Sequence, residues 1–138
     1  MANTISEVMM PSPVTCGPDS RIQEAAELMR DRDIGDVVVV DGDEVRGIVT
    51  DRDLVVRALA AGHQPDTPLG DVLSDRVVAV SPTTSVQQAA EIMAEQAIRR
   101  LPVVDDGRLV GIVSIGDLAI SQDPRSALAD ISAAPGNS

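Results

Sequence analysis

The chain has 138 residues, the size of one domain or of two small repeats that share a core. Its 22 acidic and 11 basic residues give a net charge of −11, so electrostatic repulsion opposes binding to nucleic acid or to an anionic membrane. All basic residues are arginines and no residue is aromatic, which excludes a P-loop lysine, a Schiff-base lysine and an aromatic stacking platform. We therefore expect neither a nucleic-acid partner nor a membrane partner.

The N-terminal sequence and the cysteine content indicate a cytoplasmic protein. The stretch MANTISEV lacks the basic and apolar regions of a signal peptide, and no apolar run approaches the roughly 18 residues of a membrane span. Cys16 is the single cysteine, so a disulfide within the chain is impossible.

The first half of the chain predicts alternating strands and helices. A short helix is expected around residues 4 to 9, and an extended segment follows at residues 13 to 16. The pattern Ser20-x-x-Gln23 is a capping box, and the helix after it has an apolar face made of Ile22, Ala25, Ala26 and Met29. Two short strands, residues 37 to 40 and 45 to 49, are joined by a turn that contains Asp and Gly. Thr50 then begins a helix that ends near Gly62 and Pro65 and carries Leu54, Val55, Ala58 and Leu59.

The second half repeats this pattern. Residues 8 to 54 align with residues 72 to 118 without a gap, and the helix, the first strand and the end of the second strand share many identical residues. The expected elements are a short helix at 68 to 73, an extended segment at 77 to 80, a helix capped by Thr84-x-x-Gln87, strands at 101 to 104 and 109 to 113, and a helix that begins at Ser114. Each copy is therefore a βαββα unit with a short preceding helix.

This organisation predicts one compact α/β module. We divide it into a first repeat, residues 1–64, and a second repeat, residues 65–122. A C-terminal tail, residues 123–138, is expected to be partly helical, with Ala127, Leu128 and Ile131 on one face, and then disordered.

A polar motif is repeated where the second strand of each copy ends, as GIVTDRDL and as GIVSIGDL. Both versions keep a hydroxyl and, three residues later, a carboxylate: Thr50 with Asp53, and Ser114 with Asp117. One interpretation is a capping box, in which both groups bind free N–H groups of the first helical turn. The other is a ligand site, because a carboxylate accepts hydrogen bonds from two donors spaced like a cis-diol. The glycine of each motif, Gly47 or Gly111, also lets another group approach the strand closely.

The tandem βαββα repeat, the Gly-Ile-Val-[Ser/Thr]-x-x-Asp-Leu motif and the segment IRRLPVVD at residues 98 to 105 resemble a pair of cystathionine-β-synthase (CBS) domains. The resemblance covers roughly residues 5 to 122, without an attached catalytic or DNA-binding domain. It implies a pseudo-two-fold arrangement in which the sheets of the two repeats face each other. It also implies two clefts between the repeats, which in many members bind adenine nucleotides or related adenosyl ligands, and a disc-like pairing of two modules.

The resemblance also assigns candidate nucleotide-binding residues. In nucleotide-binding relatives the hydroxyl and the Asp of the motif bind the ribose, which implies this role for Thr50, Asp53, Ser114 and Asp117. Basic groups before the second hairpin often meet ligand phosphates, and Arg99 and Arg100 lie there, while Arg52 lies inside the first motif. Residues of the predicted strands complete the candidate set: Thr15, Val37, Val78 and Pro102. The alternatives are a cap without a ligand, and arginines that are solvated or paired with nearby acids such as Asp51, Asp105 and Asp106.

The two copies differ in charge around the motif. The first copy has Gly35 and Asp36 at the places of the two consecutive arginines of the second copy. The two clefts could bind phosphate through arginines from different parts of the sequence, or only one of the two clefts could bind phosphate. We expect better phosphate binding in the cleft that receives Arg100, because Asp36 and Asp51 would repel a phosphate.

Catalysis and metal binding find little support in the sequence. His63 is the single histidine and lies in the linker between the repeats, which disfavours a nucleophilic triad. His63 and Cys16 together cannot provide a tetrahedral zinc site within one chain, although a site shared across a dimer stays open. Cys16 is interpreted as a small buried hydrophobic residue.

The sequence thus predicts a regulatory or sensory module without catalytic activity. We expect it to require no cofactor, and the resemblance implies an adenine nucleotide (AMP, ADP or ATP) as its ligand. A homodimer is expected, because small residues allow close approach of helices: Ala25, Ala26, Ala89 and Ala90. The bound form would be presented to an unidentified effector protein. The alternative is a structural or protein-interaction module whose clefts stay empty.

Overall fold

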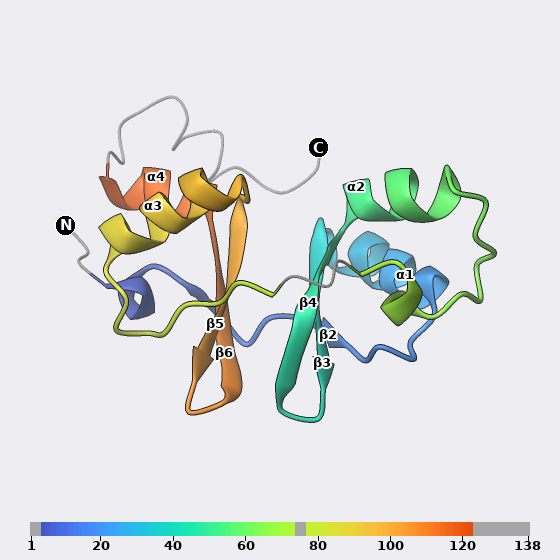
Figure 1. The fold of residues 1–138 in the computed structure, drawn as a ribbon, viewed down its shortest axis with the longest axis horizontal. Coiled ribbons are helices and arrows are strands. Elements are labelled where there is room, and N and C mark those ends of the chain that lie inside the picture. Colours follow the sequence, from blue (N-terminus) through green and yellow to red (C-terminus); the bar gives the residue numbers. More distant parts are fainter. Residues whose placement is uncertain (1–3, 74–76, 123–138) are drawn as a thin grey trace. The chain divides into compact units, whose positions relative to one another are not determined.

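The structure is a computed structural model, and it describes residues 4–73 and 77–122. The chain divides into two compact units. Of the described residues, the first-repeat unit contains those from Val14 to Val77, and the second-repeat unit combines those up to Pro13 with those from Val78 to Gln122. Each unit contains a three-stranded sheet together with helices, which confirms the predicted α/β class (Figure 1).

The first-repeat unit contains a sheet with the strand order β2-β3-β4. The short strand β2 runs parallel to β3, and β3 and β4 form an antiparallel hairpin. In chain order its elements are β2 (Thr15–Cys16), α1 (Ile22–Arg32), β3 (Asp36–Asp41), β4 (Glu44–Thr50), α2 (Asp51–Asp53), the π-helix η2 (Leu54–Leu59) and the 3-10 helix η3 (Leu69–Asp71).

The second-repeat unit contains a sheet with the strand order β1-β6-β5, in which both pairings are antiparallel. Its elements are the 3-10 helix η1 (Ile5–Glu7), β1 (Met10–Pro11), α3 (Val86–Gln96), β5 (Arg100–Asp105), β6 (Arg108–Ser114) and α4 (Ile115–Gln122). The extended segment predicted at residues 77 to 80 is reduced to one parallel bridge, between Val80 and Val103. The bridge occupies the place that β2 has in the other unit.

The two hairpins have the same construction. Each shows a register shift, between Val39 and Val40 in one unit and between Val103 and Val104 in the other, where the second strand has one extra residue, as in a β-bulge. Their tight turns use residues with positive φ, among them Gly42 (63°) and Gly107 (79°). The hairpins predicted from the alternation of apolar runs and Asp/Gly turns are therefore confirmed.

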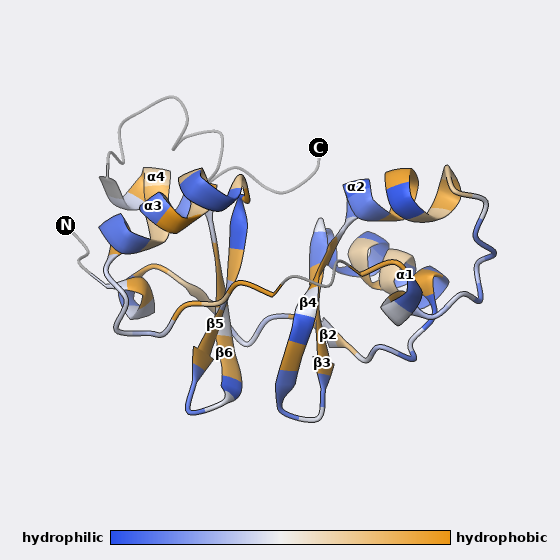
Figure 2. Cartoon of the chain, viewed as in Figure 1, coloured by the Kyte–Doolittle hydropathy of each residue, from blue (hydrophilic) through white to orange (hydrophobic). Residues whose placement is uncertain are grey.

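Each unit has its own aliphatic core, as a sequence without aromatic residues requires. Val37 and Val39 of β3 are fully buried in one core, and Leu101 and Val103 of β5 are fully buried in the other. The methionines of α1 and α3, Met29 and Met93, pack in these cores as expected. Figure 2 shows the apolar residues concentrated along the strands of both units.

The short helix that precedes each repeat packs in the unit of the other repeat. In the second-repeat unit Ile5 of η1 is fully buried, and its N–H donates to the Thr84 carbonyl oxygen at 2.9 Å. In the first-repeat unit Leu69 of η3 is fully buried, and its N–H donates to the Ser20 carbonyl oxygen at 2.7 Å. The division of the chain by packing therefore differs from the division into residues 1–64 and 65–122, which follows the repeat.

Gly111, the glycine of the second motif, allows the N-terminal strand β1 to approach β6 closely. Strand β1 pairs with β6 so that Pro11 lies opposite Gly111. A Cβ atom at Gly111 would lie 2.6 Å from Met9 Sδ and 2.9 Å from the Met10 carbonyl oxygen. The predicted close approach is confirmed at this position, and the approaching group is the N-terminal strand of the same chain.

The two capping boxes predicted for α1 and α3 are each displaced by one residue. For α3 the N-cap is Ser85, whose hydroxyl accepts from Gln88 N at 3.0 Å while Ser85 N donates to Gln88 Oε1 at 3.2 Å. The Thr84 hydroxyl instead accepts from Ser81 N in the preceding turn. The prediction was wrong because a hydroxyl one residue before a helix can accept a hydrogen bond within the preceding turn. The next residue in the chain then becomes the N-cap.

In α1 the same displacement places Arg21 at the N-cap. Arg21 N and Arg21 Nε both donate to Glu24 Oε1, at 3.3 and 3.1 Å. The Ser20 hydroxyl accepts from Gly17 N at 3.1 Å. The two hydrogen bonds from Arg21 hold the pKa of Glu24 below its usual range, and the bond from the Arg21 backbone has the largest effect.

The helix predicted after Thr50 is present but is not a regular α-helix. After α2 it continues as the π-helix η2, in which Ala60 N donates to the Val55 carbonyl oxygen at 2.9 Å. Of the apolar residues in η2, Ala58 is buried, whereas large side chains stay exposed: Val55 (57%), Val56 (49%) and Leu59 (71%). The helix stops before Gly62, whose φ is 84°.

The helix predicted to begin near residue 123 lies outside the described residues. Among the helices of residues 4–73 and 77–122, none combines the length and the apolar character that crossing a membrane requires.

Candidate functional site

The first copy of the motif forms a closed pair of hydrogen bonds at the junction of β4 and α2. Asp53 N donates to Thr50 Oγ1 at 3.1 Å, and Thr50 N donates to Asp53 Oδ2 at 2.9 Å. The second carboxylate oxygen, Asp53 Oδ1, lies 3.7 Å from Arg57 Nε. The capping interpretation is therefore confirmed for this copy, and both oxygens of Asp53 already have partners.

The second copy forms the same cap at the junction of β6 and α4. Ser114 N donates to Asp117 Oδ2 at 2.8 Å, and Asp117 N donates to Ser114 Oγ at 3.2 Å. Among the described residues, however, no group pairs with Asp117 Oδ1. One carboxylate oxygen is thus fixed by the cap and the other is available to a further donor.

The residue opposite the motif hydroxyl carries a different charge in each unit. In the antiparallel ladders Asp36 pairs with Thr50, and Arg100 pairs with Ser114. Paired residues of neighbouring strands have Cβ atoms about 4.5–5.5 Å apart. The structure therefore brings the predicted phosphate-binding residue Arg100 next to Ser114, and it brings a carboxylate to the same place in the first-repeat unit.

The residue after each motif hydroxyl makes an equivalent backbone hydrogen bond in the two units. Asp51 N donates to the Gly35 carbonyl oxygen at 2.9 Å, and Ile115 N donates to the Arg99 carbonyl oxygen at 2.8 Å. Arg99 is thereby fixed beside the start of α4. In the part of the chain that the structure describes, the guanidinium groups of Arg52 and Arg99 form no ion pair. The alternative that these two arginines bridge to nearby acids is not realised for them.

The other candidate residues are Thr15, Val37 and Pro102 on the strands, and Val78 in the extended segment before Val80. Thr15 of β2 is paired with Val38, and Val37 of β3 is fully buried in the core. Pro102 of β5 is buried, and its carbonyl oxygen accepts from Val80 N at 3.1 Å. Val78 packs at the edge of the same core. These residues shape the sheets on which the two motifs are mounted.

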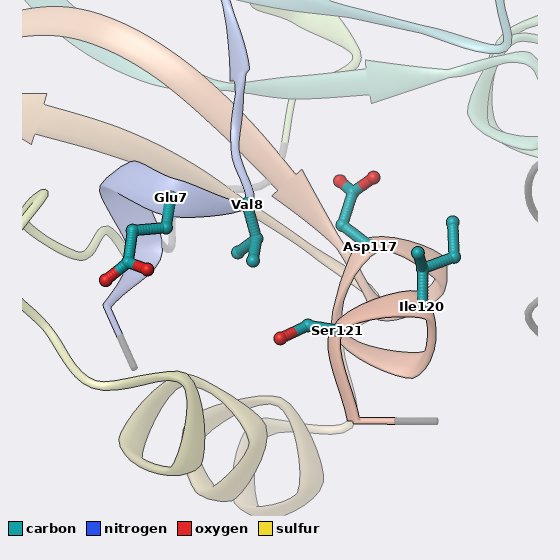
Figure 3. A pocket seen from close by; sticks show the side chains of 5 residues that line it. All are labelled: Glu7, Val8, Asp117, Ile120 and Ser121. Atoms are coloured by element: carbon teal, nitrogen blue, oxygen red, sulfur yellow. The ribbon is translucent and has the colours of Figure 1, made fainter. Parts of the chain in front are cut away.

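A pocket of about 240 Å³ lies beside Asp117 within the second-repeat unit. Its lining combines the end of η1 with one face of α4: Glu7, Val8, Asp117, Ile120 and Ser121 (Figure 3). Ser121 Oγ is buried and has no hydrogen-bond partner among the described residues. Figure 3 shows the carboxylates of Glu7 and Asp117 pointing in different directions. Of the predicted site residues, this pocket contains Asp117 alone.

Sequence reasoning missed the other four lining residues. Ser121 follows Asp117 by one helical turn, so the helix periodicity could have placed it on the same face. Glu7 and Val8 reach the pocket because η1 packs in the second-repeat unit. No local pattern in the sequence indicates that packing.

The structure places Cys16 in the core of the first-repeat unit. Cys16 is buried (8% exposed), and its burial, followed by the charge of Glu24, raises the pKa of its thiol. This confirms its interpretation as a buried residue. Within the described residues, no three His, Cys, Asp or Glu side chains are grouped so that they could hold a metal ion.

Comparison with known proteins assigns the fold to a family. The family model described as "CBS domain" matches residues 5–59 and 69–121. The CBS domain-containing protein YhcV of Bacillus subtilis is 40% identical over 120 residues, which is 87% of this chain and 86% of YhcV. Hypoxic response protein 1 of Mycobacterium tuberculosis is 39% identical over 119 residues, 84% of this chain and 83% of that protein.

Solved structures agree with this assignment. A crystal structure of Hypoxic Response Protein I with two coordinated zinc ions has a TM-score of 0.76 and 36% identity, covering 84% of this chain and 96% of that chain. A hexameric CBS-CP12 protein from bloom-forming cyanobacteria has a TM-score of 0.77 and 27% identity, covering 95% and 76%. The chain therefore belongs to the CBS domain family and contains a CBS pair, a module of regulatory and sensory proteins.

Proposed function

We propose that the protein is a regulatory module that binds an adenine nucleotide through its CBS motifs and performs no catalysis of its own. The observation that carries this proposal is the state of Asp117. Its Oδ2 atom is fixed by Ser114 N, its Oδ1 atom has no partner among the described residues, and it borders a pocket. Arg100 is placed opposite Ser114 in the ladder, where it can supply a cation.

This arrangement suits a ribose phosphate. A fixed carboxylate offers an acceptor for the two hydroxyls of a ribose, and hydrogen bonds to a charged group are the stronger class. A guanidinium group binds a phosphate through two parallel hydrogen bonds. The residues nearest to the motif thus combine an acceptor for the sugar with donors for the anion.

Replacing Asp117 with Asn tests the ribose contact. We expect Asp117→Asn to weaken AMP binding tenfold or more, since a hydrogen bond to a charged group contributes about 1.5–3 kcal/mol. The free energy of unfolding should change little, because the amide oxygen of Asn can still accept the hydrogen bond from Ser114 N. Isothermal calorimetry with AMP, and urea denaturation of the same variant, measure the two effects.

The matched control is Asp106→Asn in the turn between β5 and β6. It removes the same charge from the same unit, and Asn tolerates the positive φ of 52° at this position. The control should bind AMP like the parent protein. If AMP, ADP and ATP all leave the melting temperature of the parent unchanged at millimolar concentration, the proposal is wrong, because a ligand of the folded state must raise it.

We also expect the protein to form a homodimer. Ala25 and Ala89 are buried within the cores of their own units, so they cannot form the helix contacts that we predicted for them, whereas Ala26 and Ala90 are exposed. The exposed apolar side chains of η2 offer a further surface for association. Light scattering should give twice the mass of one chain at tens of micromolar, and the mass of one chain would contradict the expectation.

An interaction module without a ligand is the second candidate. The exposed residues of η2, Val55, Val56 and Leu59, favour it because large apolar side chains on one short helix are typical of a protein contact. The thermal-shift series separates the two candidates, since an interaction module shows no response to nucleotides.

A further inference from the structure

The pocket between η1 and α4 contains a buried hydroxyl that no described residue satisfies. Ser121 Oγ is buried and has no hydrogen-bond partner in the described part of the chain. Figure 3 shows the Ser121 side chain pointing from α4 toward η1. A buried hydroxyl without a partner destabilises a folded protein, and native structures contain few of them. The pocket wall therefore calls for a further group that can form a hydrogen bond with Ser121.

The pocket also carries an unbalanced charge. Of the five described residues that line it, Glu7 and Asp117 are acidic and none is basic. Glu7 Oε1 accepts from the Thr4 hydroxyl at 3.0 Å, and Asp117 Oδ2 belongs to the cap of α4. The other oxygen of each carboxylate has no partner among the described residues. Val8 and Ile120 are apolar, so the lining suits an occupant that combines a cation with apolar side chains.

The chain continues from the wall of this pocket. Ser121 is followed by Gln122, the last residue of α4, and then by the C-terminal tail, residues 123–138. Arg125 is the single basic residue of this tail. Three residues of extended chain span at most about 11 Å, so the guanidinium group of Arg125 stays within reach of the pocket.

The composition of the tail meets both requirements of the lining. Arg125 is opposite in charge to the two carboxylates, and Leu128 and Ile131 belong to the apolar face expected for the tail. A segment that is joined to its site by a short flexible linker has an effective concentration in the millimolar range. Even weak contacts therefore favour this segment over a free molecule of the same chemistry.

We propose that residues 123–138 dock in the pocket between η1 and α4, with Arg125 paired with Glu7 and a polar group of the tail hydrogen-bonded to Ser121 Oγ. The docked tail covers the wall that contains Asp117, so it restricts the access of a ligand to this carboxylate and is autoinhibitory. The autoinhibitory role rests on the proposed function, whereas the docking does not.

Limited digestion of the full chain with trypsin tests the docking. Trypsin must bind an arginine side chain in its own acidic pocket, so a paired Arg125 is protected and a free Arg125 is cleaved. Glu7→Gln removes the charge and keeps an oxygen that can accept from the Thr4 hydroxyl. We expect Glu7→Gln to release the fragment 126–138 severalfold faster than the parent protein, as measured by mass spectrometry.

The matched control is Glu95→Gln. Glu95 is an exposed residue of α3, so its replacement removes the same charge from the same unit at a distance from the lining residues. The control should release the fragment at the rate of the parent protein. Equal rates of release from Glu7→Gln and Glu95→Gln would overturn the docking.

Reversal of the charges identifies the pair. Glu7→Arg should speed hydrogen exchange in η1 and in the last turn of α4, because it repels the tail. Adding Arg125→Glu should restore the parent rate, since the pair forms again with opposite polarity. A double variant that exchanges as fast as Glu7→Arg alone would show that Arg125 is not the partner of Glu7.

Ser121→Ala tests the hydroxyl by the sign of its effect. Removal of a buried hydroxyl that lacks a partner stabilises a protein or leaves its stability unchanged, whereas removal of one that has a partner destabilises it. We expect a lower midpoint in urea and faster release of the fragment 126–138. A midpoint equal to or above that of the parent protein would contradict a hydrogen bond between Ser121 and the tail.

Calorimetry with AMP decides the autoinhibitory role. Glu7→Gln should bind AMP severalfold more tightly than the parent protein, and Glu95→Gln should bind AMP like the parent protein. Equal affinities of all three would overturn the autoinhibition and leave the proposed function standing. If AMP binds neither the parent protein nor Glu7→Gln, the proposed function is wrong, while the digestion still decides whether the tail docks.

Discussion

Replacing Leu69 with Ala is expected to lower the free energy of unfolding by about 2–5 kcal/mol, the range for a large aliphatic side chain removed from a packed core. Leu69 is fully buried in the first-repeat unit, although it belongs to a three-residue helix in the segment between the repeats. Its N–H also donates to the Ser20 carbonyl oxygen at 2.7 Å, so the residue anchors η3 to the turn before α1. Urea denaturation followed by circular dichroism measures the loss.

Ile5→Ala should have a similar effect in the second-repeat unit, where Ile5 is fully buried against the core. The matched control is Leu59→Ala, because Leu59 is 71% exposed and its truncation should change stability by less than about 0.5 kcal/mol. A stability of Leu69→Ala or Ile5→Ala equal to that of Leu59→Ala would show that η1 and η3 do not pack as described.

Gly111→Ala is expected to destabilise the second-repeat unit by about 1–3 kcal/mol, the usual cost of forcing an extra carbon into a packed site. The added Cβ would meet Met9 Sδ at 2.6 Å and the Met10 carbonyl oxygen at 2.9 Å. The sulfur can move with its flexible side chain, but the carbonyl oxygen can move only if β1 separates from β6. Hydrogen exchange should therefore show faster exchange in β1 and β6, besides the lower midpoint in urea.

Gly17→Ala is the control for this substitution. A Cβ atom at Gly17 would find its nearest neighbours at 3.9 Å, and Gly17 N could still donate to Ser20 Oγ. The variant should unfold at the same urea concentration as the parent protein. A Gly111→Ala variant as stable as Gly17→Ala would contradict the pairing of β1 with β6.

The repeat made most of the fold predictable. Two aligned copies predicted two helix-and-hairpin units, and the strands β3, β4, β5 and β6 lie where the apolar runs predicted them. The caps of α1 and α3 were missed by one residue, because Ser20 and Thr84 close turns that precede the helices. The packing of η1 and η3 was not predictable, since burial of Ile5 and Leu69 depends on contacts far away in the sequence.

The candidate site was predictable in part. The hydroxyl and carboxylate of each motif were found from the spacing, and the structure confirms that they bind each other. The partners of the remaining carboxylate oxygens were not predictable. Arg57 reaches Asp53 across one helical turn, whereas the counterpart of Arg57 is a serine, and the sequence alone does not show where the side chains point. The sequence cannot show that difference between Asp53 and Asp117.

The crossed packing of η1 and η3 has a consequence for how such a protein can be divided. A cut in the segment between Gly62 and Thr67 would leave η3 on the C-terminal fragment and the rest of its core on the N-terminal one. The same cut would separate η1 from its core in the opposite direction. Neither fragment would contain all the residues of a complete core, so each fragment would need the other in order to fold. The smallest portion of this chain that evolution or an engineer can transfer intact is therefore the pair.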